Sequence, residues 1–233
     1  MSTEIKTRAA AGSQFSQDHA QLRQLATDVL AYARAHGASA CETEASEGFG
    51  HTVTVRCGDV ETIEYNRDKS IGVTVYAGKR RGSASTSDFS PQAMRATVDA
   101  ALSIAKFTAS DDYAGLADED LLARDIPNLD LYHPWQLPVE DAIELAQACE
   151  DAAFAVDKRI ANSEGATVSL QQSHFIYANS LGFIDGYPNS RHWISCAVIA
   201  GKGEPMQRDN WYSTARKSSK PETPEAIGRT AGT

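Results

Sequence analysis

Six histidines are the first residues to consider for metal chemistry. They are His19, His36, His51, His133, His174 and His192. In a zinc hydrolase with an H-E-x-x-H motif, two histidines one helical turn apart direct both imidazoles to the same ion. No two histidines here have that spacing, so isolated surface or packed histidines are favoured over a site assembled from distant ones. The sequence indicates no metal-ligating, cofactor-binding or catalytic residue.

Motifs for nucleophilic or phosphate chemistry are also missing. The G-x-S-x-G nucleophile elbow does not occur, and Arg81-Gly82-Ser83-Ala84-Ser85 is better interpreted as a strand of small residues. Gly48-Phe49-Gly50 lacks the third glycine and the following helix of a dinucleotide-binding loop, and no P-loop is present.

Two charged clusters have a functional and a structural interpretation each. Glu42 and Glu44 fall on one face of a predicted strand, as a carboxylate pair for acid–base chemistry requires. Lys79-Arg80-Arg81 stands at a predicted hairpin and could bind a carboxylate or an acidic partner. For the glutamates, a strand face exposed to solvent is the favoured interpretation. For the basic run, a solvated turn is favoured over a binding site.

The composition and net charge exclude some classes of binding partner. The chain has 233 residues and a formal net charge of −9, which is the wrong sign for binding nucleic acid or an anionic membrane surface. No stretch approaches the roughly 20 apolar residues of a membrane span, and residues 1–14 do not resemble a secretory signal. The four cysteines form no C-x-x-C motif and are predicted to be reduced thiols: Cys41, Cys57, Cys149 and Cys196. These features predict a cytoplasmic protein.

The elements that would position these residues form a first α+β unit over residues 15–109. Helical spacing predicts a helix over 17–36, with Ser16 as its cap and Gly37 after its end, and another from Pro91 to about Phe107, capped by Ser90. Between them, alternation predicts an antiparallel meander of short strands with a polar turn at 66–69. The strands are expected at 41–45, 51–57, 60–65, 71–76 and 80–86.

An acidic linker over 110–138 precedes a second α+β unit over 139–218. A helix is predicted at 139–156, followed by antiparallel strands at 166–170, 174–178, 193–200 and 207–213. Two copies of Asn-Ser-x-Gly, at 162–165 and 179–182, suit tight turns. Residues 219–233 begin a further helix at Pro224, which predicts that the sequence is a fragment with a truncated C-terminal region.

Several ordered motifs together resemble the N-terminal portion of the TldD/PmbA family (peptidase U62-like). They are the runs at 56–64 and 71–86, Asn162-Ser163-Glu164-Gly165, Ala-Asn-Ser-Leu-Gly-Phe at 178–183 and Asp-Asn-Trp-Tyr-Ser-Thr-Ala-Arg at 209–216. The similarity extends from about Leu22 to the end of the chain, and the last two motifs resemble the PmbA (TldE) branch more closely than the TldD branch.

This resemblance implies a subunit of a two-component cytoplasmic metallopeptidase that cuts unfolded or leader peptides. In that family the zinc motif, H-E-x-x-x-H, belongs to TldD-like subunits and lies C-terminal to the region matched here. No cofactor is therefore expected in this chain, and zinc is expected in a TldD-like partner. The implied partners are that subunit or a second copy of this chain, and extended peptides held by main-chain hydrogen bonds.

Two alternatives remain open at this point. The chain could be a fragment of a catalytic TldD-like zinc peptidase whose metal motif follows Thr233. It could also be a non-enzymatic regulatory or binding module of the gyrase-modulator type.

Overall fold

The computed structural model describes residues 15–203 and 205–233. In these residues the fold is α+β, as predicted, with four α-helices, one short 3-10 helix and a seven-stranded antiparallel sheet in the order β3-β2-β1-β4-β6-β7, in which β5 also pairs with β4. The helices are α1 (His19–Ala35), α2 (Pro91–Phe107), η1 (Glu119–Leu121), α3 (Val139–Phe154) and α4 (Pro224–Ala231). The strands are β1 (Ala40–Arg56), β2 (Asp59–Ala77), β3 (Arg80–Thr86), β4 (Ile160–Asn179), β5 (Ile184–Asp185), β6 (Pro188–Ala200) and β7 (Gln207–Ala215).

The strands are longer than the sequence predicted. The segments predicted at 41–45 and 51–57 belong to one strand, β1, except for Cys57 in the turn after it, and the predicted turn at 66–69 lies inside β2. Likewise, 166–170 and 174–178 are both parts of β4. The error has a physical cause: β1 is paired along nearly its whole length with β2 on one side and β4 on the other, and this pairing outweighs the local break at Gly48-Phe49-Gly50.

The two Asn-Ser-x-Gly copies have different structures. At 179–182 the chain turns after β4, and Gly182 has a φ of +95°, as predicted. At 162–165 the prediction of a tight turn is wrong, because the segment forms a bulge within β4 and shifts the register with β6 between Ser163 and Gly165. Gly165, with a φ of +116°, supplies the left-handed backbone of this bulge.

Helix capping was predicted correctly for α2 but not for α1. Ser90 accepts the backbone N–H of Ala93 and Pro91 opens α2, while Gly37 follows the end of α1 with a φ of +97°. The cap of α1 is Asp18, which forms a reciprocal capping box with Gln21, and not Ser16. The backbone N–H of Ser16 is instead bound by Glu47 of β1.

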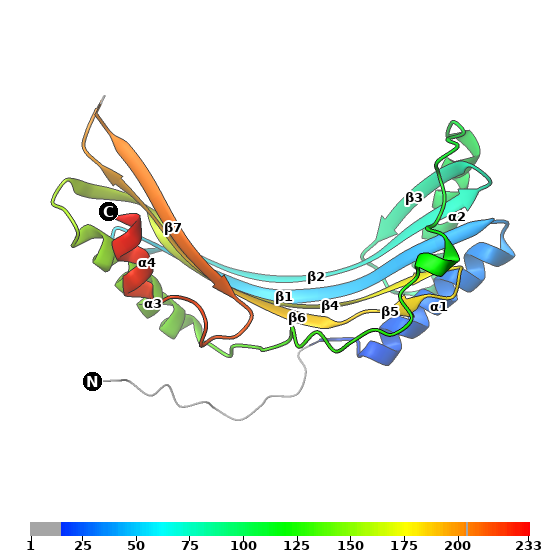
Figure 1. The fold of residues 1–233 in the computed structure, drawn as a ribbon, viewed down its shortest axis with the longest axis horizontal. Helices are drawn as coiled ribbons and strands as arrows, with labels where there is room; N and C mark the ends of the chain where they lie inside the picture. Colours follow the sequence, from blue (N-terminus) through cyan, green and yellow to red (C-terminus); the bar gives the residue numbers. More distant parts are fainter. Residues whose placement is uncertain (1–14, 204) are drawn as a thin grey trace.

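The sheet curves into a trough, and all four α-helices pack on its convex side (Figure 1). At one end, α1 and α2 cover a cluster that includes Leu22, Val29, Ile71, Val98 and Ile176. At the other end, α3 and α4 cover a second cluster that includes Val53, Cys149, Val168, Ile194 and Ile227. The concave face carries no helix in the part of the chain that the structure describes.

The segment between α2 and α3 crosses the convex side from one helix pair to the other (Figure 1). It contacts the sheet where β6 extends past the end of β7, and the Ser190 N–H donates to the Leu131 carbonyl at 3.0 Å. Because β1 and β4 run through both ends, one sheet serves both predicted units, and the division at 110–138 stays a prediction. None of the described helices has the length and apolar character needed to cross a membrane.

Candidate functional site: the concave face of the sheet

The concave face is formed by the residues that alternate with the buried ones. In β1, Ala45 and Val53 are fully buried under the helices, so Glu44 and Thr52 point to the opposite, open side. Pairs of hydroxyl groups cross this side between neighbouring strands. They are Thr52 with Ser169 at 2.8 Å, Thr54 with Thr167 at 3.0 Å and Thr74 with Ser83 at 3.0 Å. A hydroxyl can both donate and accept, so the face offers hydrogen bonds of either polarity.

A hollow of about 470 Å³ lies on this face towards the α1–α2 end, and Glu42 is on its wall. The Glu42 carboxylate accepts hydrogen bonds from the hydroxyls of Tyr76, at 3.0 Å, and Tyr177, at 2.7 Å. Burial, together with the bond to Glu42, raises the pKa of Tyr177 to about 12 and also raises that of Tyr76. Both tyrosines therefore stay protonated and hold the carboxylate in place.

Gly72 forms part of the floor of this hollow. A Cβ at Gly72 would meet no atom within 4 Å, so the space above its backbone is open. A second hollow of about 300 Å³, nearer the middle of the sheet, shares Glu44 with the first and continues to Asp68 and Ser173. The two hollows together form a shallow groove along β1, whose lining includes polar side chains.

Further aromatic side chains lie on the same face, and one of them, Phe175, lines the second hollow. The rings of Trp193 and Tyr212 lie 5.1 Å apart, and the Arg191 guanidinium lies 5.5 Å from the Trp193 ring. Phe175 contacts Tyr187 edge to face at 4.8 Å. Aromatic rings and hydroxyls on one open surface can bind a peptide through both its apolar side chains and its main chain.

The histidines do not assemble a metal site. Among residues 15–203 and 205–233, no group of three or more His, Cys, Asp or Glu side chains could hold a metal ion. His133 and His192 are close in space, but the His192 Nε2 bonds the His133 carbonyl at 2.9 Å and the His133 Nε2 bonds the Asp130 carbonyl at 2.8 Å. Both rings thus form hydrogen bonds with backbone carbonyls, and they do not point to a shared ligand.

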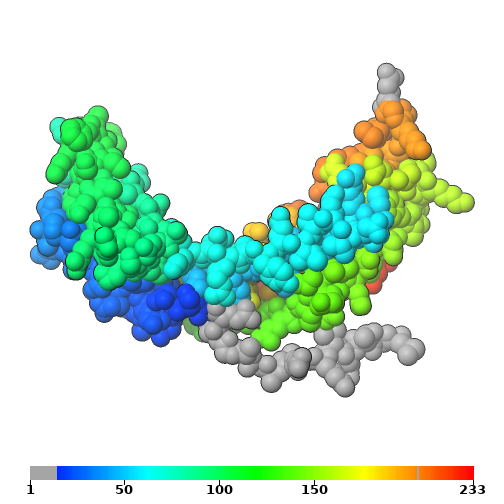
Figure 2. Space-filling view, turned by 180° about the vertical axis from the view of Figure 1, so that it is seen from behind, coloured from blue at the N-terminus to red at the C-terminus, as the bar shows by residue number. Residues whose placement is uncertain are grey.

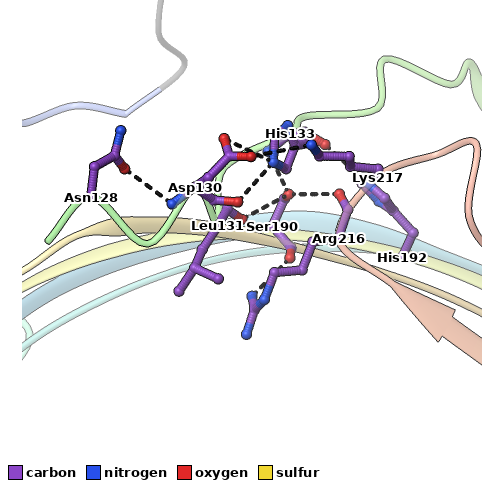
Figure 3. A network of polar contacts seen from close by, with 8 residues as sticks. All are labelled: Asn128, Asp130, Leu131, His133, Ser190, His192, Arg216 and Lys217. Atoms are coloured by element: carbon purple, nitrogen blue, oxygen red, sulfur yellow. Dashed lines mark hydrogen bonds and ion pairs between the residues drawn. The ribbon is translucent and has the colours of Figure 1, made fainter.

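Figure 3 shows the network to which these two histidines belong. Ser190 of β6 accepts the His133 N–H at 2.8 Å and donates to the Arg216 carbonyl at 3.1 Å, while Lys217 pairs with Asp130 at 3.1 Å. The network fixes the segment between α2 and α3 against the end of the sheet. Its contacts are structural, and burial lowers the pKa of His192, which favours a neutral ring.

The two charged clusters have different outcomes. Glu42 and Glu44 do share the exposed face of a strand, but Glu42 is held by two tyrosines and is more ordered than a solvated side chain. Lys79, in the turn before β3, donates to the Ala114 carbonyl at 3.2 Å, and Arg80, the first residue of β3, donates to the Lys106 carbonyl at 2.9 Å. The Arg81–Ser85 run is a strand, as predicted, and all four cysteines are free.

Two buried carboxylates on the convex side were missed by sequence reasoning. Glu47 accepts the backbone N–H groups of Ser16 at 2.9 Å and Gln17 at 3.1 Å and lies 3.8 Å from His174. Burial raises the pKa of Glu47, but the backbone hydrogen bonds outweigh burial and place the pKa below its usual value.

Glu150 of α3 is the second, and it is fully buried. It accepts the N–H groups of Cys57 at 2.9 Å and Gly58 at 2.8 Å, and so joins the β1–β2 turn to α3. The only sequence signal was its spacing, since Glu150 follows Ala146 by four residues and lies beside the apolar stripe of the helix.

Comparisons with known proteins agree with this architecture. The model of the PmbA/TldA metallopeptidase domain 1 matches residues 41–105, and that of the PmbA/TldA metallopeptidase central domain matches residues 132–233. The metalloprotease PmbA of Escherichia coli O157:H7 is 44% identical over 199 residues, which are 85% of this chain and 44% of that protein. The chain thus spans somewhat less than half the length of that relative.

Solved structures show the same fold. A Bacteroides thetaiotaomicron protein, described as a proposed modulator of DNA gyrase, superposes with a TM-score of 0.81 at 22% identity, over 90% of this chain and 48% of that one. TldE from Thermococcus kodakarensis superposes with a TM-score of 0.70 at 13% identity, over 89% of this chain and 46% of that one.

The fold and the two matched models together define an α+β portion of a metallopeptidase-type protein. The chain belongs to the PmbA/TldD family and is PmbA-like, and it corresponds to the N-terminal portion of its relatives.

Proposed function

We propose that this chain is the substrate-holding N-terminal portion of a PmbA/TldE-like subunit in a two-component cytoplasmic metallopeptidase. In this proposal its concave face binds extended segments of unfolded or leader peptides, and the zinc belongs to a TldD-like partner. The observation that carries the proposal is the open groove along β1, which has hydroxyl groups, carboxylates and Arg81 on its walls. No hydrolytic step is assigned to this chain, because its described residues offer no group that fits a metal ion.

The groove suits a ligand of variable sequence. Every peptide presents the same main-chain N–H and C=O groups, and hydroxyls such as those of Ser83 and Ser85 can bond either kind. The open floor at Gly72 leaves room for a main chain to approach the strand. Binding would therefore depend on the extended shape of the peptide more than on its side chains.

The groove can be tested by filling it. Gly72→Val adds a β-branched side chain whose Cβ would meet no atom within 4 Å, so the strand is expected to persist while the hollow is occupied. Anisotropy of a fluorescein-labelled, unstructured peptide of mixed sequence measures binding. We expect Gly72→Val to weaken binding about tenfold, the equivalent of about 1.4 kcal/mol.

Gly115→Val is the matched control. Gly115 is exposed between α2 and α3, and a Cβ there would also meet nothing within 4 Å. The Gly115→Val variant is expected to leave peptide affinity unchanged. If both variants bind peptide as tightly as the original chain, the groove is not the peptide site.

The gyrase-modulator interpretation is supported by the descriptions of two structural neighbours, from Bacteroides thetaiotaomicron and Thermotoga maritima. The net charge of −9 opposes direct contact with DNA. A titration that showed tight, salt-sensitive DNA binding would favour that interpretation over the peptidase subunit.

A further inference from the structure

The sequence motif at 209–216 does not line the groove along β1. It forms most of β7 and ends just after that strand. Within it, Trp211 lies opposite the buried Cys196 and faces the helices, whereas Tyr212 lies opposite Ser195 and points to the concave face. The motif thus supplies an aromatic ring to the open side of the sheet.

Tyr212 lies beside an aromatic residue of β6. Its ring is 5.1 Å from that of Trp193, and the Arg191 guanidinium is 5.5 Å from the same Trp193 ring. Arg191 and Trp193 both point to the concave side, because His192 between them is buried on the convex side. Tyr212 is 50% exposed, so its ring is accessible to a ligand in the trough.

The last residue of the motif brings a second cation to the same place. The Arg216 guanidinium donates to the Ser190 carbonyl at 3.0 Å and to Asn189 Oδ1 at 3.4 Å (Figure 3). Asn189 is two residues before Arg191 on β6 and therefore shares its face. Two arginines and two aromatic rings thus lie together on the concave side of β6 and β7. We call these four residues the β6 shelf: Arg191, Trp193, Tyr212 and Arg216.

The arginines of the β6 shelf have no carboxylate partner in the part of the chain that the structure describes, since neither forms an ion pair there. The carboxylates that line the groove, such as Glu42 and Asp68, lie on β1 and β2, and β4 separates those strands from β6. Figure 2 shows the trough open between its two ends, with β2 in cyan on the near flank. The far flank, formed by β6 and β7, is therefore complementary to an anionic ligand.

We propose that the β6 shelf is a specificity subsite of the peptide-binding face, which binds an aromatic side chain together with a carboxylate two residues away. This inference rests on the proposed function and names the peptides that the face prefers. An aromatic side chain can stack against Trp193 and Tyr212. A carboxylate can accept charge-assisted hydrogen bonds from Arg191 and Arg216, which a neutral side chain at that position cannot replace.

The two-residue spacing follows from strand geometry. In an extended peptide, alternate side chains point to the same side and are about 6.8 Å apart. Arg191 and Trp193 are separated by the same interval along β6. A peptide that lies along β6 therefore places one side chain at the rings and the next side chain on that side at the arginines.

A matched set of labelled peptides tests the preference. The parent is a short unstructured peptide of Gly, Ser and Gln with a central Phe-Ser-Glu and an amidated C-terminus. Its affinity for the 233-residue chain is measured by fluorescence anisotropy. Replacing Phe by Ala in the peptide is expected to weaken binding about tenfold, and replacing Glu by Gln about fivefold. A peptide that ends two residues after Phe, compared as the free acid and the amide, shows whether a C-terminal carboxylate binds in the same way.

Substitutions in the chain locate the subsite. Tyr212→Thr is expected to weaken binding of the parent peptide about fivefold and to have little effect on the Ala peptide. Arg191→Gln is expected to weaken binding of the Glu peptide about fivefold and to leave the Gln peptide nearly unchanged. Both substitutions are at exposed side chains, so the fold should persist.

The convex side offers matched controls. Tyr65 is 73% exposed there, and Arg95 of α2 also lies over an aromatic ring, 5.9 Å from that of Tyr32. Tyr65→Thr and Arg95→Gln are expected to leave the affinity for every peptide unchanged. As a second measurement, a peptide with nitrophenylalanine in place of Phe should quench tryptophan fluorescence, and Trp193→Phe should remove most of that quenching.

Equal affinities for all the peptides would overturn this inference and leave the proposed peptide-binding function standing. Shelf substitutions that weaken binding no more than the convex controls would also overturn it. If none of the peptides binds, the proposed function and this inference both fail.

Discussion

The two faces of the sheet are built from alternate residues of the same strands, yet they carry different chemistry. On the convex face, the apolar residues Ala45 and Val53 of β1 pack under the helices. On the concave face, Thr52 and Thr54 of the same strand pair with hydroxyls of β4. Strand periodicity alone produces this separation, because successive side chains point to opposite sides.

Polar groups have different roles on the two faces. On the convex side, the buried carboxylates of Glu47 and Glu150 each accept two backbone N–H groups and so tie neighbouring segments together. On the concave side, the hydroxyl pair of Thr74 and Ser83 lies in the open groove and is exposed. We infer that convex polar residues maintain the fold, whereas concave ones can be changed with little loss of stability.

The largest expected effect is at Glu150. Glu150→Ala would remove two hydrogen bonds from the N–H groups of Cys57 and Gly58 to a charged group, which costs about 3 kcal/mol of unfolding free energy. Urea unfolding, monitored by circular dichroism, measures this loss of unfolding free energy. Glu144→Ala, an exposed position on the same helix, should cost well under 1 kcal/mol. Equal losses in the two variants would contradict the structural role of Glu150.

The second prediction concerns Glu47 and pH. The pKa of Glu47 is lower in the folded chain than its usual value of about 4.3, so its carboxylate contributes stability that is present above that value. This contribution is lost as the pH falls through the lower, folded pKa. Glu47→Gln lacks a titrating group and should be about 2 kcal/mol less stable at neutral pH, with the difference shrinking in acid.

Unfolding curves of both proteins, from neutral pH to below the pKa of free glutamate, test this prediction. A difference in unfolding free energy that stays constant across the range would show that the charge of Glu47 does not stabilise the fold.

Much of the fold could be predicted from the sequence, because helices and strands have strong local signals. The stripe of α2 and the alternation in β1 identified buried residues such as Val98 and Val53. The length of the strands could not be predicted, because it depends on pairing between distant segments, such as Gly48 with Ser173. The same holds for the bulge at Ser163, which is set by its partner strand β6.

The candidate site was harder to predict than the fold. Glu42 and Glu44 were recognised as sharing a face, but Tyr76 and Tyr177, which bond Glu42, are 34 and 135 residues away in sequence. Only the curvature of the sheet and the placement of all four helices on one side show that this face is open. Neither property is contained in the local pattern of any one strand.

The smallest expected effect on stability is for a variant of the concave face. This variant tests the comparison between the two faces most directly. Replacing Thr74 by Val and Ser83 by Ala together removes both partners of the hydroxyl pair that lines the groove and leaves no buried group unsatisfied, so unfolding free energy should change by about 1 kcal/mol or less. Peptide binding should nevertheless weaken by about threefold to tenfold, as the anisotropy assay would show.

Thr97→Val provides the matched change in the helical layer. Thr97 of α2 is buried, and its hydroxyl bonds the Ala93 carbonyl at 2.8 Å. It should leave peptide affinity unchanged, because α2 lies on the convex side. If the concave double variant instead lost stability while keeping its affinity for peptide, the hydroxyl pairs would serve the fold, and the division of labour between the two faces would be wrong.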